Sequence, residues 1–155
     1  MIRTGIGIDS HQFTKNKKLI LAGKLIPDNF GLKANSDGDV IYHSLCNAIG
    51  TAIGHGSLSL YSDDMCKNGI TDSSKYLLHI FNIAKKKGYK INNISISIEC
   101  KTPKIESHVI DFKKNIAKIL ETNVDNIGIC ATSGEGLTDF GKGKGIQVIS
   151  IVTLI

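Results

Sequence analysis

The chain lacks the features that mark membrane-spanning and secreted proteins. It has no tryptophan and only two prolines among its 155 residues. No apolar run approaches the ~20 residues that a membrane-spanning helix requires, and no basic segment followed by an apolar one begins at Met1. We therefore expect a cytoplasmic protein without a membrane partner, long enough to bury a core of its own.

Cysteines are few and do not cluster. The four cysteines lie far apart and form no Cys-x-x-Cys pair. This spacing indicates neither a disulfide framework nor a zinc ribbon. Because Cys100 and Cys130 fall within apolar strand patterns, we expect buried, reduced thiols.

Acidic residues are outnumbered by basic ones, and the formal net charge is +5. The lysine clusters at 85–87 and 113–114 lie on the surfaces of expected helices. No basic stripe is interleaved with aromatic side chains, so the usual pattern of nucleic-acid binding is absent and we expect no nucleic-acid partner. The positive field would favour a small anionic substrate equally well.

The apolar periodicity predicts one α+β domain over residues 1–155. A repeat of 3.6 residues predicts helices near 37–54, 73–88 and 109–120, and alternation predicts strands at 5–13, 94–100, 127–131 and 146–154, with two short strands within 19–27. This order predicts a two-layer sandwich, with one mostly antiparallel, mixed sheet and helices on one face. The segment from His55 to Asp72 has no period, and we expect a binding loop or lid there, with surface disorder as the alternative.

The stretch from Ser36 to His43 places a polar turn, Ser-Asp-Gly-Asp, in front of an apolar helix. Ser36 or Asp37 can cap that helix, because a side-chain oxygen accepts from the free N–H groups of the first turn. His43 follows Asp39 by one helical turn. This spacing suits an imidazole that a carboxylate orients for metal binding; a capped helix with a surface histidine is the alternative.

A second pair of candidate ligands lies near the N-terminus. In the expected strand, Asp9 and His11 are two positions apart and therefore share one face, while Ile6 and Ile8 share the other. With His43 they supply one carboxylate and two imidazoles. Three such ligands leave the fourth position of tetrahedral zinc open, as catalysis requires.

Two phosphate-binding patterns are incomplete. The stretch from Gly136 to Gly143 imitates a P-loop but ends in glycine where the motif needs Ser or Thr for Mg²⁺; its Lys142 can still contact phosphate. Gly5-x-Gly7 lacks the third glycine of a dinucleotide fingerprint. No serine or cysteine has the local features of a nucleophile. Any chemistry therefore rests on metal, phosphate positioning and charge stabilisation.

Taken together, these motifs resemble those of the 2-C-methyl-D-erythritol 2,4-cyclodiphosphate synthases. The most specific part is Ser-Asp-Gly-Asp-Val-x-x-His-Ser at 36–44. The supporting parts follow in order along nearly the whole chain: Gly-x-Asp-x-His at 7–11, Pro-Lys at 103–104, Ala-Thr-Ser-x-Glu at 131–135 and Gly-x-Gly-x-Gly at 141–145.

The resemblance implies a homotrimer with active sites between neighbouring subunits. It implies zinc on Asp9, His11 and His43, and a second divalent metal, Mg²⁺ or Mn²⁺, that Glu135 helps to bind on the substrate's diphosphate. These four are the implied catalytic residues. The implied substrate-binding residues are Asn35, Ser36, Asp39 and Lys142, with a cytidine and phosphate pocket formed by Pro103, Lys104, Ile105, Ala131, Thr132 and Ser133.

The family reaction belongs to the non-mevalonate isoprenoid pathway. It cyclises 4-diphosphocytidyl-2-C-methyl-D-erythritol 2-phosphate and releases CMP, and the substrate's own 2-phosphate attacks the β-phosphorus. The resemblance thus implies a lyase that works by positioning and charge stabilisation, with zinc as Lewis acid. Two alternatives stay open: a zinc-dependent phosphohydrolase, and a basic nucleotide- or RNA-binding module with a structural metal.

The chain also departs from the family pattern. Asn35 stands where His is common, and Asn47 stands where Asp is usual. The segment from Gly54 to Leu58 disrupts a Gly-Asp-Ile-Gly motif that helps to hold the nucleotide ribose in the family. Lys142 replaces a common Arg, which keeps the charge but loses the planar fork. We therefore expect ribose recognition to differ here.

Overall fold

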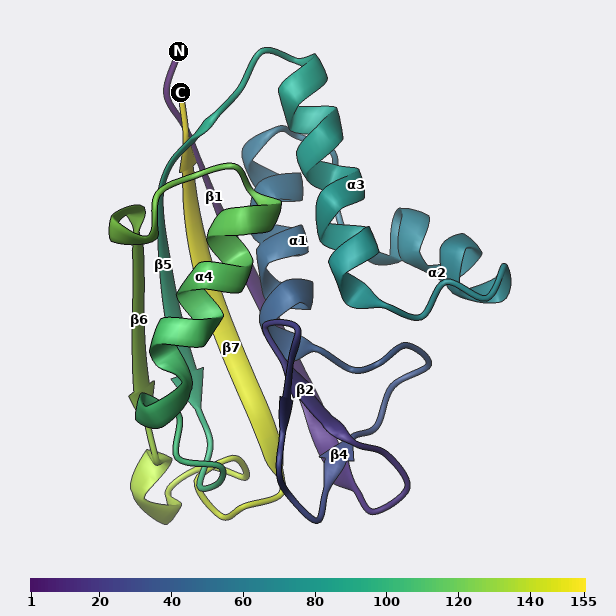
Figure 1. Cartoon of the computed structure of the whole chain (residues 1–155), viewed down its shortest axis with the longest axis vertical. Helices are drawn as coiled ribbons and strands as arrows, with labels where there is room; N and C mark the ends of the chain where they lie inside the picture. The colour runs from purple at the N-terminus through teal and green to yellow at the C-terminus, as the bar shows by residue number, and fades with distance from the viewer.

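A five-stranded mixed sheet carries the helices of this chain on one of its faces (Figure 1). The computed structural model describes residues 1–155. The strand order is β4-β1-β7-β5-β6, and only β5 and β6 run parallel. The strands are β1 (Arg3–Thr14), β4 (Gly31–Leu32), β5 (Ile91–Glu99), β6 (Ile127–Thr132) and β7 (Gly145–Leu154), and β2 (Leu19–Leu21) pairs with β3 (Lys24–Ile26) in a separate hairpin. The predicted α+β architecture is confirmed.

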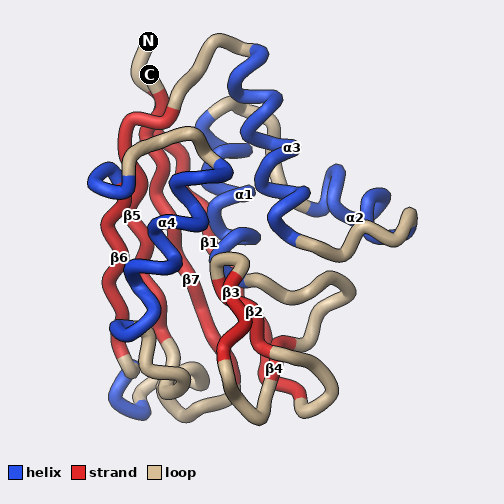
Figure 2. Tube along the Cα trace, viewed as in Figure 1, coloured by secondary structure: helices blue, strands red, loops and turns tan.

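The helices form the second layer. Helix α1 (Val40–Ala52) packs on β1 and β7, α4 (Val109–Ile119) lies over β6, and α3 (Ser73–Lys86) packs against α1. Helix α2 (Ser59–Lys67) extends to the side of this layer (Figures 1 and 2). Short 3₁₀ turns lie at Glu106–His108, Val124–Asn126 and Gly134–Gly136. No helix has the length and apolar composition needed to cross a membrane.

The core lies between the sheet and α1, α3 and α4. Alternate residues of β5 and β7 are buried there, as the two-residue period predicts, including Ile96 and Val148. The buried row of β7 contains one polar residue, Ser150, whose hydroxyl lies 2.6 Å from that of Ser44 on α1. This pairing satisfies two buried hydroxyls and fixes the helix against the strand.

Two glycines bring α1 unusually close to β1. A Cβ added at Gly7 would lie 2.0 Å from the carbonyl oxygen of Ser44, and one added at Gly5 would lie 2.0 Å from that of Ala48. Strand and helix backbones therefore touch directly. Asp9 and His11 point to this helix-facing side of β1, in line with the predicted alternation.

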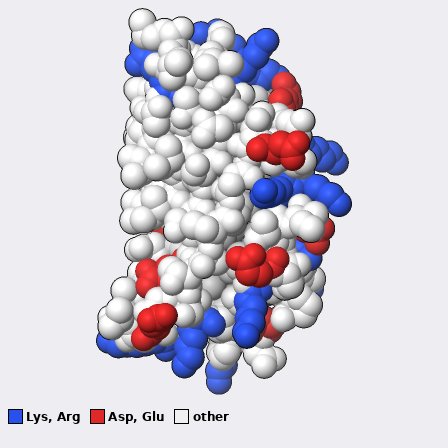
Figure 3. Space-filling view, turned by 90° about the vertical axis from the view of Figure 1, so that its left-hand side faces the viewer, with Lys and Arg blue, Asp and Glu red and all other residues white.

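The other face of the sheet has no helix over it. Ile6, Ile8 and Ile151 lie there with 60%, 55% and 40% of their surface exposed. Figure 3 looks onto the side of the chain where β6 lies and shows a broad area free of charged atoms, with the charges gathered at both ends and along one border. An apolar face of this kind is typical of a surface that a partner covers.

Three local predictions are wrong. Residues 59–67 form α2 rather than part of an aperiodic loop. This helix buries only Tyr61 and Ser62 and so carries no apolar stripe for periodicity to detect. Cys130 is exposed, because it faces the open side of β6. Asp39, rather than Ser36 or Asp37, caps α1 by accepting from the N–H of Tyr42.

Candidate metal centre and active-site cleft

Asp9, His11 and His43 come together where β1 meets the first turn of α1. The Oδ2 atom of Asp9 lies 3.0 Å from Nδ1 of His43 and 3.1 Å from Nε2 of His11, and the two nitrogens are 3.0 Å apart. The three ligand atoms thus form a nearly equilateral triangle and lie close enough together to share one metal ion. The sequence-predicted ligands are therefore brought together by the fold.

This triangle fits a tetrahedral cation. Zinc bonds of ~2.0–2.1 Å place neighbouring ligands of a tetrahedron roughly 3.3 Å apart, close to the observed separations. Two imidazole nitrogens that both face one carboxylate oxygen suit a shared cation better than a hydrogen-bond network. The donor set, one carboxylate and two imidazoles, is one that zinc accepts and leaves a fourth position open.

The electrostatics of Asp9 also favour cation binding. Partial burial raises the pKa of its carboxyl, but the adjacent imidazoles of His11 and His43 outweigh burial and hold the pKa well below its usual range. The carboxyl therefore stays ionised throughout the physiological pH range. A metal ligand must be deprotonated, so Asp9 is ready to bind without releasing a proton.

The second nitrogen of His43 is held by serine hydroxyls, not by Asp39. Its Nε2 lies 2.8 Å from the hydroxyl oxygen of Ser73 and 3.3 Å from that of Ser36. The Ser73 hydroxyl donates to Asp37. Sequence reasoning missed Ser73 as a site residue, because its only local signal is its place at the start of α3.

Asp39 serves the fold instead. Its side chain is fully buried and accepts from the backbone N–H groups of Ala22, Gly23 and Tyr42, at 3.0, 2.7 and 3.2 Å. Burial raises the pKa of this carboxyl, and the N–H donors oppose that rise. Asp39 therefore ties the β2–β3 hairpin to the start of α1, and its predicted contact with His43 is wrong.

The triangle opens into a cleft of about 630 Å³. Residues 33–36, including the predicted Asn35 and Ser36, line the cleft. Residues of α2 and the turn before it also line it, with contributions from Leu58, Ser59, Ser62, Asp63 and Cys66. Helix α2 thus supplies part of the site in place of the expected loop.

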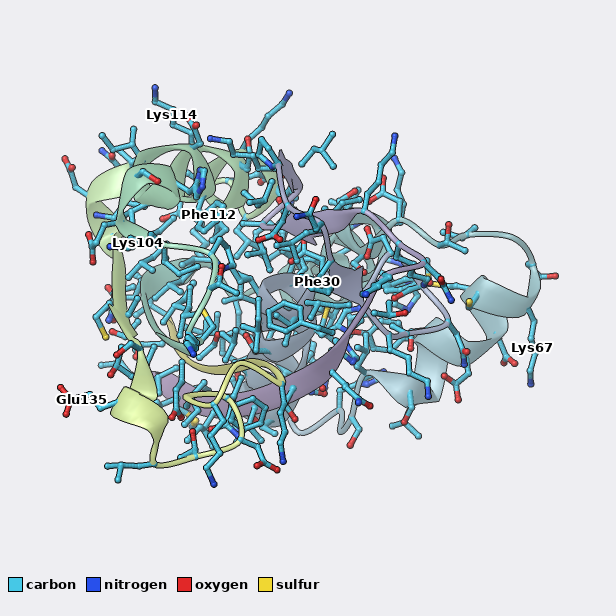
Figure 4. The ribbon with its side chains drawn as sticks, turned by 90° about the horizontal axis from the view of Figure 1, so that it is seen from below. Phe30, Lys67, Lys104, Phe112, Lys114 and Glu135 are labelled. Carbon is cyan, nitrogen blue, oxygen red and sulfur yellow. The ribbon has the colours of Figure 1, made fainter.

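The remaining predicted residues lie elsewhere. Pro103, Lys104 and Ile105 follow β5, Ala131 and Thr132 end β6 with Ser133 directly after it, and Lys142 lies in the glycine-rich segment before β7. None of them lines the cleft of the triangle. Glu135 sits at a positive φ of 47° in an exposed turn. Figure 4 shows Glu135 directed outward, at the opposite end of the view from Lys67 of α2.

The register of the sheet gives the distance between the metal triangle and the residues at the end of β6. Asp9 pairs with Val148, Val148 with Ile98, and Ile98 with Ala131. Asp9 and Ala131 therefore lie in one row, three strand spacings or about 14 Å apart. Val148 and Ile98 between them are fully buried. The predicted site residues thus form two groups that no single cleft of this chain joins.

A model of the YgbB family matches residues 2–155. The chain belongs to the YgbB family. Two similar relatives carry the name 2-C-methyl-D-erythritol 2,4-cyclodiphosphate synthase. The one from Chlamydia trachomatis serovar L2b is 40% identical over 99% of this chain and 88% of its own length. The one from Clostridioides difficile strain 630 is 38% identical over 99% of this chain and 96% of its own length.

Solved structures of this YgbB-family fold agree with the sequence relationship. The bifunctional IspDF from Campylobacter jejuni superposes with a TM-score of 0.93 at 37% identity, over 99% of this chain but only 42% of that longer chain. IspF from Plasmodium falciparum, in a CDP complex, superposes with a TM-score of 0.87 at 30% identity, over 99% of this chain and 96% of that one.

Proposed function

We propose that this chain is a 2-C-methyl-D-erythritol 2,4-cyclodiphosphate synthase. It converts 4-diphosphocytidyl-2-C-methyl-D-erythritol 2-phosphate into the 2,4-cyclodiphosphate and CMP, a step of non-mevalonate isoprenoid biosynthesis. The observation that carries the proposal is the Asp9–His11–His43 triangle at the head of an open cleft. It lies in a chain matched over 99% of its length by relatives of that name.

The chemistry needs no protein nucleophile. An oxygen of the substrate's 2-phosphate attacks the β-phosphorus, the bond between the β-phosphorus and the bridging oxygen breaks, and CMP leaves with the electron pair. The chain's task is to fold the substrate back on itself and to stabilise the phosphate charge. Lys33 and Asn35 line the cleft and can supply a cation and an amide for this purpose.

Two metal ions would assist this reaction. Asp9, His11 and His43 would hold zinc, which supplies Lewis-acid polarisation of a phosphate oxygen when bound. Glu135 would help to hold Mg²⁺ or Mn²⁺ on the diphosphate. Its exposed carboxylate and its place between glycines support this role, because the backbone there can approach a phosphate closely.

Two copies of the chain would complete each site. The 14 Å row from Asp9 to Ala131 is filled by core residues, so the residues after β5 and β6 cannot reach the metal cleft of their own chain. A homotrimer that covers the open sheet face would bury Ile6, Ile8 and Ile151. It would also bring the Lys104 and Glu135 group of one chain to the cleft of its neighbour, where the cytidine diphosphate part of the substrate binds.

Phosphorus NMR of the product mixture tests this function. Purified chain with Zn²⁺ and Mg²⁺ should convert the substrate into cyclic diphosphate and CMP in equal amounts. His43→Ala should give neither product while its urea unfolding curve stays cooperative, because a lost ligand leaves the core filled. A linear bisphosphate as the main product would instead establish hydrolysis, and no turnover by the zinc-loaded chain would favour a binding module.

A further inference from the structure

We propose that Ser73 and Asp37 form a hydrogen-bond relay that fixes the tautomer of His43 and thereby sets the metal affinity of the site. This inference rests on the metal role of the Asp9–His11–His43 triangle in the proposed function. The two residues are 36 positions apart, on the turn before α1 and at the first position of α3. Neither is a metal ligand.

The relay is continuous, and its Ser73 and His43 members are buried. His43 Nε2 lies 2.8 Å from Ser73 Oγ, and the Ser73 hydroxyl donates to Oδ1 of Asp37. The backbone N–H of Ser73 donates to the other carboxylate oxygen at 3.0 Å, and that of Asp39 donates to Oδ1 at 3.0 Å. The surface of Ser73 is 0% exposed and that of His43 is 5% exposed. Water therefore competes poorly for these hydrogen bonds.

The direction of the relay follows from its chemistry. An ionised carboxylate only accepts hydrogen bonds, so the single Ser73 proton is directed to Asp37. The free lone pair of Ser73 then faces Nε2 of His43, which must carry the ring proton. Nδ1 is left with its lone pair directed at the triangle, 3.0 Å from Asp9 Oδ2. This is the tautomer that a cation there requires.

The relay also holds the ring in place. It links the 36–39 turn, α1 and α3, so rotation of the His43 ring would break hydrogen bonds to two elements. Ser36 is the weaker partner, because its oxygen lies 3.3 Å from Nε2 and already accepts from the N–H of Gly38. Loss of such a supporting group typically weakens metal binding ~10–100-fold.

Paired variants separate this role from helix stability. Ser73→Ala removes the hydroxyl but keeps the backbone N–H bond to Asp37, and we expect zinc affinity to fall about 10–100-fold. Ser74→Ala is the control, because only the backbone of Ser74 is used, in its 2.9 Å bond to the capping Asp72. Ser73→Thr keeps the hydroxyl and should restore most of the affinity.

Asp37→Asn tests the direction of the relay at constant shape. Both oxygens of Asp37 accept from backbone N–H groups, so the amide nitrogen of Asn faces an N–H donor in either orientation, and the acceptor that aligns the Ser73 hydroxyl is weakened or displaced. We expect zinc affinity to fall in this variant, although the spacing of the atoms is kept.

Two readouts decide the matter, both on the full chain. Competition with a chromophoric chelator gives the zinc affinity. ¹H–¹⁵N NMR of the zinc-loaded chain reports the His43 Nε2–H proton. This proton should be protected from exchange with water in the wild type and should exchange rapidly in Ser73→Ala. Equal affinity of Ser73→Ala and the wild type would overturn the relay, as would equal losses in Ser73→Ala and Ser74→Ala. If Ser73→Ala does not fold, unchanged affinity in Asp37→Asn overturns it.

The same data separate this inference from the proposed function. A wild-type chain that binds no zinc overturns both the metal assignment and the relay. A wild type that binds zinc without forming cyclic product contradicts the proposed reaction only, and the affinities of the variants still decide the relay.

Discussion

Replacing Gly7 with alanine should separate β1 from α1 and damage the metal triangle. The added Cβ would lie 2.0 Å from the carbonyl oxygen of Ser44, whereas ordinary contact begins at 3.4 Å. The two backbones must therefore part by about 1.4 Å, and no side-chain rotamer can relieve the clash. Asp9 lies two residues along the same strand, so the displacement reaches the site directly.

The magnitude follows from this displacement. Overpacking of a filled interior costs about 1–3 kcal/mol, and a backbone clash belongs near the upper end of that range. For a chain of this size, ~3 kcal/mol lowers Tm by roughly 6–12 °C. A shift of about 1 Å in a catalytic group costs ~100-fold in rate. We expect both losses together in Gly7→Ala.

Gly128→Ala provides the matched control. This glycine also lies in a strand, but its added Cβ would lie 3.9 Å from the nearest atom, the carbonyl oxygen of Ile94. Thermal unfolding and zinc affinity should be measured on both variants. If Gly7→Ala matched Gly128→Ala in Tm and in zinc affinity, direct contact of the two backbones would not be what positions the triangle.

The remaining predictions concern thiols and the rim of the cleft. Burial raises the pKa of Cys46 to about 12 and that of Cys100 to about 11, so their thiolate fractions at pH 8 are small. Iodoacetamide labelling followed by mass spectrometry should therefore modify the exposed Cys130 and the half-buried Cys66 before these two; early labelling of Cys46 would contradict its burial. Asn35→His, which restores the common family residue, should keep activity, and Asn35→Ala should lower it; an inactive, zinc-loaded Asn35→His chain would show that the local geometry differs from the family's. Lys17 donates to the backbone carbonyls of residues 34 and 36, which line the cleft. Lys17→Ala should therefore raise KM while lowering Tm only slightly, and an unchanged KM would show that this lysine does not shape the cleft.

Local patterns predicted the elements that bury a regular face. Helix α3 is an example, because Leu77 and Phe81 recur at the helical period and Asp72 caps its start. Strand β5 is another, with alternating isoleucines facing the core. The three candidate metal ligands were also predictable, because their spacing places two on one strand face and one on a helix.

Long-range contacts were not predictable in the same way. Ser73 meets His43 only because α3 packs on α1, 30 residues further along the chain. Asp39 has the sequence spacing of a histidine partner, but the β2–β3 hairpin supplies N–H groups that occupy its carboxylate. Helix α2 has no apolar stripe, because it packs along the rim of a cleft rather than over the core.

Mixing two inactive variants tests the shared site most directly. His43→Ala removes the metal half of the site, and Lys104→Ala together with Glu135→Ala removes the other half. Each variant alone should form no cyclic product. When the two variants are co-refolded in equal amounts and assemble at random, about a quarter of the interfaces have both halves intact. Product should then appear at roughly a quarter of the wild-type rate. Mixed assemblies that form and yet make no product would contradict an active site built from two copies of this chain.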